Sequence, residues 1–205
     1  RLSIIDTSAG GHQPMVSRSG RFVVSYNGEI YNFPALRQQL ATVGQRFQSS
    51  SDTEVLLAAI EHWGLEAAVR RLVGMFAFAL WDRETRNLSL VRDRAGEKPL
   101  YYGVVAGGLA FASELRAFRR IPGFDGLIAT EALACYLNRG HVPAPLTIFR
   151  SVAKLLPGHF ATVGVRDGAA IDVSTHAYWR AEDAFGCDTP MPYESARERA
   201  WELLD

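Results

Sequence analysis

The stretch "SYNGEIYNFPALRQQL", residues 25–40, connects two segments of different periodicity. Residues 21–26 are rich in apolar and aromatic side chains, which predicts a strand. Pro34 opens a segment with leucines at helical spacing, which predicts a helix over residues 34–43. The Asn27-Gly28 pair between them predicts a turn, because both residue types tolerate a positive φ. The way this pair connects strand and helix therefore decides the local fold.

Beyond this stretch, helices are followed by short strands. In "SSSDTEVLLAAIEHWG", Ser51 and Glu54 have the spacing of a capping box, and Gly64 ends the predicted helix. Residues 65–73 predict another helix. Strand-like runs then follow in hairpin sequence, which favours antiparallel pairing. They are "MFAFALWD", "LSLVRD", "PLYYGVV" and "GLAFAS".

The C-terminal part of the chain mixes loops with two further helices. A short helix after Ser113, a helix over residues 131–138 and a proline-rich extended passage are predicted. "GHFATVGV" and "GAAIDVSTHAYW" predict a last hairpin, residues 181–192 a linker, and residues 193–205 a helix. Strands, then helices, then more strands predict an α+β layered fold rather than an alternating α/β one.

Composition and charge predict a globular chain. Of the 205 residues, 48% are hydrophobic and 21% charged, so a packed core is expected. Lysine plus arginine equals aspartate plus glutamate, 22 against 22, so no net field favours nucleic acid or an acidic membrane. No apolar run approaches the ~18 residues of a membrane span. Cys135 and Cys187 are widely separated, so we expect neither a disulfide nor a zinc site, and a cytoplasmic location.

A few polar residues could bind a small ligand together. Asn27 and Gly28 offer a side-chain amide and a backbone N–H, which are the donors of an oxyanion hole. Asp52 lies just inside a predicted helix start, where a carboxylate is favoured. With Arg1 and Glu29, these residues supply the cation, donor and carboxylate that a zwitterionic amino acid needs. Taken singly, each also has a structural explanation as a turn, a surface charge or a helix start.

Other stretches predict no chemistry of their own. "VRDRAGEKPLYYG", residues 91–103, is interpreted as a solvated hairpin loop, because its single central glycine does not make a phosphate-binding loop. The chain has no Gly-x-Ser-x-Gly element, and its 5 histidines lack metal-ligand spacing. We therefore expect no metal and no cofactor in this chain.

Several motifs occur in the order found in glutamine-hydrolysing asparagine synthetases, and the chain resembles that family over residues 1 to about 180. The motifs are "RLSIID", "HQPM", "NGEIYNF", "SDTEVLL", "GMFAFALWD", "RDRAGEKPLYY", "FASELRA" and "VPAPLTIF…LLPGH". The resemblance implies the N-terminal class II glutamine amidotransferase (glutaminase) domain. It also implies the N-terminal-nucleophile (Ntn) hydrolase fold, a four-layer αββα sandwich of two antiparallel sheets, here truncated at its N-terminus.

The resemblance also implies a role for each candidate residue. Arg1 would hold the glutamine carboxylate, and Asn27 with Gly28 would form the oxyanion hole. Glu29 and Asp52 would hold the amino-acid end of the substrate. The backbone that follows Arg1 would line the pocket, through Leu2, Ser3, Ile4 and Ile5.

The implied chemistry is acyl transfer from glutamine. An N-terminal cysteine thiolate attacks the side-chain amide, with its own α-amino group as base, and ammonia leaves before water hydrolyses the thioester. That cysteine precedes the "RLSI" strand in the family, so it is not among these residues, and neither Cys135 nor Cys187 replaces it. Because the chain starts at Arg1, we expect it to be a piece of a longer protein.

The resemblance further implies how the full-length protein is organised. Residues 1–165 would form the glutaminase domain, 166–192 a connector, and 193–205 the start of the first helix of a synthetase domain. That domain would use ATP and Mg²⁺ to amidate aspartate to asparagine with the ammonia released here. A homodimer is expected, with no nucleic-acid or membrane partner.

Two other functions are considered. Some relatives keep this fold as a non-catalytic half while the other half closes a β-lactam or a peptide ring. Retention of Arg1, Asn27, Gly28, Glu29 and Asp52 favours the glutaminase instead. A sugar-amidating synthase is the weakest alternative, because "VPAPLTIF" and Tyr178-Trp179 speak against it.

Overall fold

The structure is a computed structural model that describes residues 11–164, 172–184 and 191–204. The "RLSI" strand that the resemblance implies lies outside the described residues, and so do Arg1 and the pocket-lining residues that follow it. Cys187 lies outside them as well. Within the described ranges, no helix combines the length and apolarity that crossing a membrane requires.

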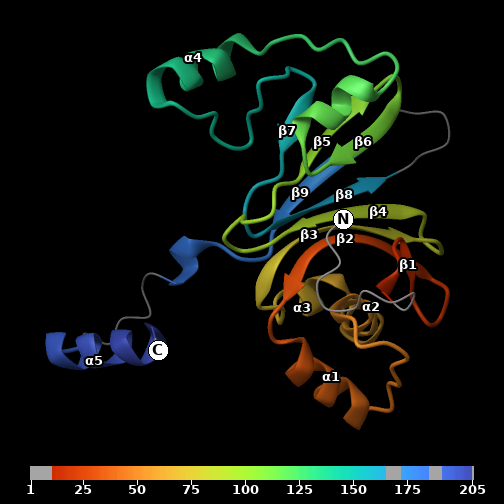
Figure 1. The fold of residues 1–205 in the computed structure, drawn as a ribbon, viewed down its shortest axis with the longest axis vertical. Helices are drawn as coiled ribbons and strands as arrows, with labels where there is room; N and C mark the ends of the chain where they lie inside the picture. Colours follow the sequence, from red (N-terminus) through yellow and green to blue (C-terminus); the bar gives the residue numbers. More distant parts are fainter. Residues whose placement is uncertain (1–10, 165–171, 185–190, 205) are drawn as a thin grey trace.

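The first sheet has six antiparallel strands in the order β1-β2-β3-β4-β8-β9 (Figure 1). The predicted last hairpin is confirmed, because β8 and β9 pair along their whole length. It forms one edge of the sheet, although β9 lies within the range predicted as a connector. The bounds are Met15–Val16, Phe22–Ile30, Gly74–Asp82, Asn87–Arg92, His159–Gly164 and Asp172–Ala177, in chain order.

The second sheet has three strands in the order β6-β5-β7 and lies above the first in Figure 1. Its strands are β5 (Tyr101–Val105), β6 (Gly108–Ala112) and β7 (Val152–Lys154). Two of the predicted hairpins, β3–β4 and β5–β6, are confirmed as antiparallel pairs. The turn between β4 and β5 makes no hairpin, because the chain changes sheet there.

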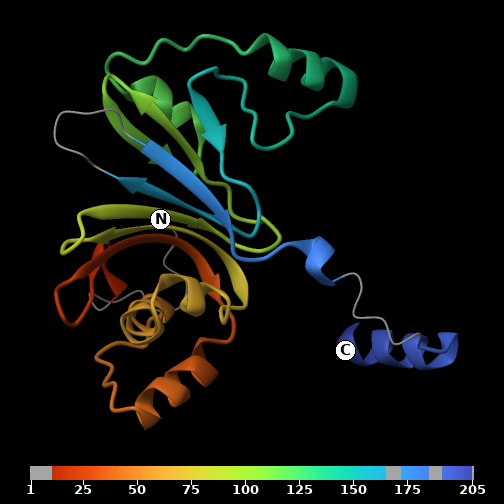
Figure 2. The same ribbon diagram turned by 180° about the vertical axis from the view of Figure 1, so that it is seen from behind.

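Helices lie on the outer sides of both sheets, and the last two extend beyond them. Figures 1 and 2 show α1 (Phe33–Thr42), α2 (Asp52–Trp63) and α3 (Leu65–Val69) under the first sheet. The 3₁₀ helix η2 and α4 lie on the side of the second sheet, whereas η3 and α5 extend beyond β9. Their bounds are Leu115–Arg120, Thr130–Arg139, Ala181–Ala184 and Tyr193–Leu204.

Helix α2 begins and ends as its sequence predicts, with one difference. Ser51 caps it by accepting from the Thr53 N–H at 3.1 Å, and Gly64 ends it at φ +79°. Glu54 does not complete the capping box, because its carboxylate accepts from the N–H groups of residues 48 and 49. The helix predicted over residues 65–73 stops at Val69.

Three apolar clusters fill the three interfaces of a four-layer α+β sandwich, which confirms the predicted fold class. Along β3, Phe76 and Phe78 pack against the helices, whereas Ala77 and Ala79 face the second sheet. This alternation follows from the two-residue period of a strand. On the outer face of the second sheet, Phe118 of η2 is fully buried.

The predicted turn at Asn27-Gly28 is wrong. Both residues lie inside β2, where Asn27 pairs with Ala77 and Gly28 with Phe76. Strand β3 is a long apolar strand that pairs with all of β2 in unbroken register. Tertiary pairing therefore overrides the local preference of Asn-Gly for a turn.

The predicted solvated loop at residues 91–103 is also wrong, because two buried charged residues, Arg92 and Asp93, bond to its backbone. Asp93 is completely buried and accepts from the N–H groups of Phe76, Glu97 and Lys98 at 3.0–3.2 Å. Arg92 donates to the carbonyls of Lys98, Leu155 and Gly96. The side chains thus satisfy the backbone of the segment that crosses from one sheet to the other.

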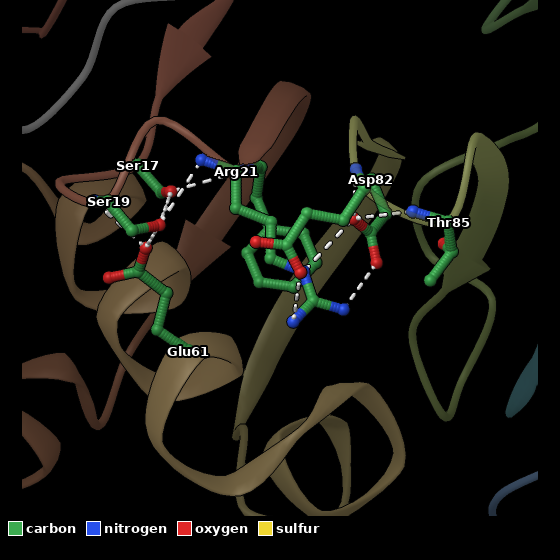
Figure 3. Close-up of polar contacts among 8 residues, drawn as sticks. Ser17, Ser19, Arg21, Glu61, Asp82 and Thr85 are labelled. Atoms are coloured by element: carbon green, nitrogen blue, oxygen red, sulfur yellow. Dashed lines mark hydrogen bonds and ion pairs between the residues drawn. The ribbon is translucent and has the colours of Figure 1, made fainter.

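Polar contacts join the segment just before β2 to α2 and to the end of β3 (Figure 3). Glu61 of α2 accepts from Ser19 in the β1–β2 connection, and the donors around it lower the pKa of this carboxyl. Arg21 binds Asp82 through two bonds, Nε to Oδ1 at 3.0 Å and Nη2 to Oδ2 at 2.7 Å. The Arg21 bonds lower the pKa of Asp82 to about 2.

We predict that Asp82→Asn destabilises the chain by about 1 kcal/mol at pH 7, a value reduced because Arg21 is partly exposed. A carboxyl with a lowered pKa stabilises the fold above its ordinary pKa of 3.8 and loses this effect as pH falls toward 2. Urea unfolding from pH 7 to pH 2.5 should therefore show the difference from the parent shrinking. Glu84→Gln, at an exposed partner of Arg21, is the control with little effect. A difference independent of pH would contradict this assignment.

Candidate functional site

Asn27 lies on the face of β2 that points toward the second sheet. It pairs with Ala77, whose side chain belongs to the cluster between the sheets. A cleft of about 590 Å³ opens here, and Glu29 shares this face of the strand by its two-residue spacing. The cleft is lined from the first sheet by Ser25, Tyr26, Asn27, Ala77, Phe78 and Ala79, and from elsewhere by Gln13, Pro14, Leu100, Phe111, Ala112, Ser113 and Glu114.

The Asn27 amide is held across the cleft. Its Nδ2 donates to the hydroxyl of Ser113 at 3.3 Å, and Ser113 directly follows β6 of the second sheet. An amide nitrogen carries two hydrogens, so one such bond leaves a second donor available to a ligand. Small residues at Ala77 and Ala79 leave the space in which a ligand could approach it.

The N–H of Gly28 points to the outer edge of β2, the edge opposite β3. Phe76 is the residue of β3 that pairs with Gly28, and both its N–H and its carbonyl bond to Asp93, on the side away from β2. In an antiparallel pair, two opposed residues either bond to each other or both point their N–H and carbonyl groups away from each other. Because those of Phe76 point away from β2, those of Gly28 point away from β3. The residues two positions before and after Gly28 point the same way, because the N–H groups of Tyr26 and Ile30 bond to side chains beyond this outer edge.

Only glycine fits position 28. Its φ is +152°, and a Cβ there would lie 2.1 Å from the carbonyl oxygen of Met75. Gly74 on β3 makes the matching approach, with a Cβ position 2.1 Å from the Glu29 oxygen. The two glycines let β2 and β3 pair closely around Glu29 while the Gly28 N–H faces outward.

Asp52 reaches the same outer edge from the first turn of α2. Its Oδ2 accepts from the Tyr26 hydroxyl at 2.8 Å and from the Ile30 N–H at 3.1 Å, and the residue is 5% exposed. The helix start favours its negative charge. Burial, followed by the charge of Asp52, raises the pKa of Tyr26, so its phenol remains a donor.

The structure therefore brings some predicted site residues together. The Gly28 N–H and the Asp52 carboxylate lie at the outer edge of β2, whereas the Asn27 side chain lies on the adjoining face toward the cleft, a face that Glu29 shares by alternation. Arg1, Leu2, Ser3, Ile4 and Ile5 lie outside the described residues. Sequence reasoning missed the partners Tyr26, Ser113 and Gln13. Of these, Tyr26 alone carried a signal, as an aromatic residue in the strand predicted over residues 21–26.

No metal centre is found within residues 11–164, 172–184 and 191–204, since they hold no suitable group of histidine, cysteine and acidic side chains. Cys135 lies on α4 as a free thiol and is absent from the lining of the cleft. The chemistry of the described site is therefore that of hydrogen-bond donors and a buried carboxylate.

Comparison with known proteins gives a family match over most of the chain. The family described as "Glutamine amidotransferase domain" matches residues 1–179. A Mycobacterium tuberculosis protein that carries a provisional name as a glutamine-hydrolysing asparagine synthetase is 44% identical over 171 residues, 80% of this chain and 26% of that protein. Glutamine-hydrolysing asparagine synthetase 1 of Bacillus subtilis is 40% identical over 181 residues, 88% of this chain and 28% of its own length. The chain thus spans about a quarter of these curated relatives.

Solved structures share the fold at lower identity. A structure described as the allosteric regulatory enzyme of purine biosynthesis matches 87% of this chain and 34% of its own, with a TM-score of 0.62 and 23% identity. The glutamine phosphoribosylpyrophosphate amidotransferase of Bacillus subtilis matches 85% and 33%, with a TM-score of 0.59 and 22% identity. At these identities the likeness supports the two-sheet fold alone.

We predict that Gly28→Ala destabilises the chain by about 3 kcal/mol, because the new Cβ meets the backbone of β3 and must separate the two strands. Gly44→Ala is the matched control, since Gly44 also has a positive φ of +90° but has open space around it. That variant should lose only about 1 kcal/mol of backbone strain. Urea unfolding measures both, and equal losses would show that the close approach at Gly28 is unimportant.

Proposed function

We propose, from the premise that the chain belongs to the glutamine amidotransferase domain family, that its cleft binds glutamine. The full-length protein then hydrolyses the side-chain amide to glutamate and ammonia. The observation that carries this proposal is the arrangement on β2, where the Gly28 N–H faces the outer edge beside the Asn27 amide. Two donors on adjacent residues of one strand suit the oxyanion of a tetrahedral intermediate.

The spacing along β2 fits the length of a glutamine. Gly28 and Ile30 both direct their N–H groups to the outer edge and are about 7 Å apart, from the rise of a strand. The Asp52 carboxylate accepts a hydrogen bond from the Ile30 N–H. An extended glutamine with its side-chain carbonyl at Gly28 would bring its α-ammonium group toward Asp52. We therefore assign Asp52 to the ammonium, and Arg1 with the backbone of residues 2–5 to the carboxylate end.

The proposed reaction divides the roles between this chain and a cysteine that precedes it in the full-length protein. The thiolate attacks the amide carbon, and the electron pair of the carbonyl moves onto its oxygen. Asn27 and Gly28 donate to that oxygen. The nitrogen leaves as ammonia after taking a proton, and water then cleaves the thioester to release glutamate and the thiol.

For the full-length protein we propose asparagine synthesis, in which a further domain uses ATP and Mg²⁺ to amidate aspartate with the released ammonia. The names of the relatives at 40% and 44% identity support this proposal. They do not favour a non-catalytic half of a ring-closing enzyme. The division of residues into a glutaminase domain, a connector and the first helix of the next domain stays a prediction. So do the homodimer and the cytoplasmic location.

We predict that Asn27→Ala in the full-length protein lowers kcat for glutamine hydrolysis by about 10²–10³, the usual effect of one lost oxyanion donor. Asparagine synthesis from added ammonia should continue at the parental rate, because ammonia bypasses the cleft. Asn138→Ala, at an exposed asparagine of α4, is the matched control and should change neither rate. Comparable loss of both activities in Asn27→Ala would count against an oxyanion role.

A further inference from the structure

A tyrosine beneath β2 holds the carboxylate of Asp52. The Tyr26 hydroxyl donates to Asp52 Oδ2 at 2.8 Å, and both residues are 5% exposed. The same oxygen accepts from the Ile30 N–H at 3.1 Å. Two donors on one oxygen restrict the rotation of the carboxylate about its χ2 torsion.

Tyr26 and Asn27 connect the two ends of the proposed glutamine site through adjacent residues of one strand. Alternation places the Asn27 side chain in the cleft and the Tyr26 side chain among the helices, where it packs in the core cluster. The Tyr26 N–H is itself held by Gln13 Oε1 at 2.7 Å. Tyr26 is thus fixed at its backbone, its ring and its hydroxyl.

The packing of the core does not require the hydroxyl group of Tyr26. A phenylalanine at this position would fill the same apolar space, because the ring packs and only the oxygen is polar. A buried carboxylate, in contrast, is costly without hydrogen bonds. The Tyr26 hydroxyl therefore serves Asp52 rather than the packing of the helices.

We propose that Tyr26 is a positioning residue that orients the Asp52 carboxylate toward the α-ammonium group of glutamine, and so sets the preference for substrates that carry an α-amino group. This inference rests on the proposed function. It differs from a purely structural role, because only ligands with an ammonium group should sense the loss of the hydroxyl.

The test is Tyr26→Phe in the full-length protein, with two ligands compared. The KM for glutamine is measured together with the inhibition constant of glutaramic acid, which keeps the carboxylate and the side-chain amide but lacks the α-amino group. The KM should rise about tenfold with kcat little changed, because the loosened interaction forms equally in substrate and transition state. The inhibition constant of glutaramic acid should not change.

A matched control and a second variant complete the design. Tyr31→Phe should change neither constant, because Tyr31 is half exposed and its hydroxyl bonds to nothing within the described part of the chain. In an Asp52→Asn background, adding Tyr26→Phe should cause no further rise in KM. The cycle shows whether Tyr26 acts through Asp52, because a residue with an independent effect would raise the KM further in the Asp52→Asn background.

The outcomes separate the inference from the function on which it rests. A parallel rise of both constants in Tyr26→Phe would overturn the inference, since a general structural defect affects both ligands. An unchanged KM for glutamine would overturn it as well. If the parent protein hydrolyses glutamine and Asn27→Ala abolishes this, only the inference has failed. If the parent does not hydrolyse glutamine, the proposed function fails and the inference with it.

Discussion

The completely buried carboxylate of Asp93 is the constraint on which the arrangement of the two sheets depends. It accepts from backbone N–H groups of β3 and of the segment that leads to β5, at the point where the chain leaves the first sheet. An isolated buried charge would be strongly unfavourable, so this geometry persists only with all of its donors in place. Arg92 completes the junction by donating to three carbonyls. The position of the second sheet, and therefore the cleft at Asn27, follows from this junction.

Strand β2 combines structural support and recognition, because its two edges and its two faces each contact different parts of the protein. Its inner edge pairs with β3, and its apolar face packs on α2. Its remaining face carries Asn27, which lines the cleft, and by alternation Glu29. Along the outer edge, side chains satisfy the N–H groups on either side of Gly28, through Gln13 at Tyr26 and Asp52 at Ile30. The site thus belongs to a rigid strand, which favours the fixed donors that oxyanion stabilisation needs.

The sequence predicts most elements of this fold, but it wrongly predicts a turn at Asn27-Gly28 and a solvated loop at residues 91–103. Local patterns locate α2, the β3–β4 and β5–β6 hairpins, and the last hairpin, because periodicity and helix capping act over a few residues. They fail at Asn27-Gly28 and at Arg92-Asp93, where distant strands determine the conformation. The candidate residues Asn27, Gly28 and Asp52 could be named from motifs, but their arrangement around β2 could not, since it depends on the register of β2 against β3. Tyr26 and Ser113 were missed for the same reason, because their roles come from contacts across elements.

The central claim is that glutamine binds in the cleft and along the outer edge of β2, with its side-chain amide at Asn27 and Gly28. The most direct test is a crystal structure of the full-length protein with the product glutamate bound. The account predicts a γ-carboxylate oxygen within hydrogen-bond distance of the Gly28 N–H and of Asn27 Nδ2, with the α-ammonium group on the Asp52 carboxylate. Glutamate bound elsewhere, with the Gly28 N–H occupied by another part of the protein, would contradict it.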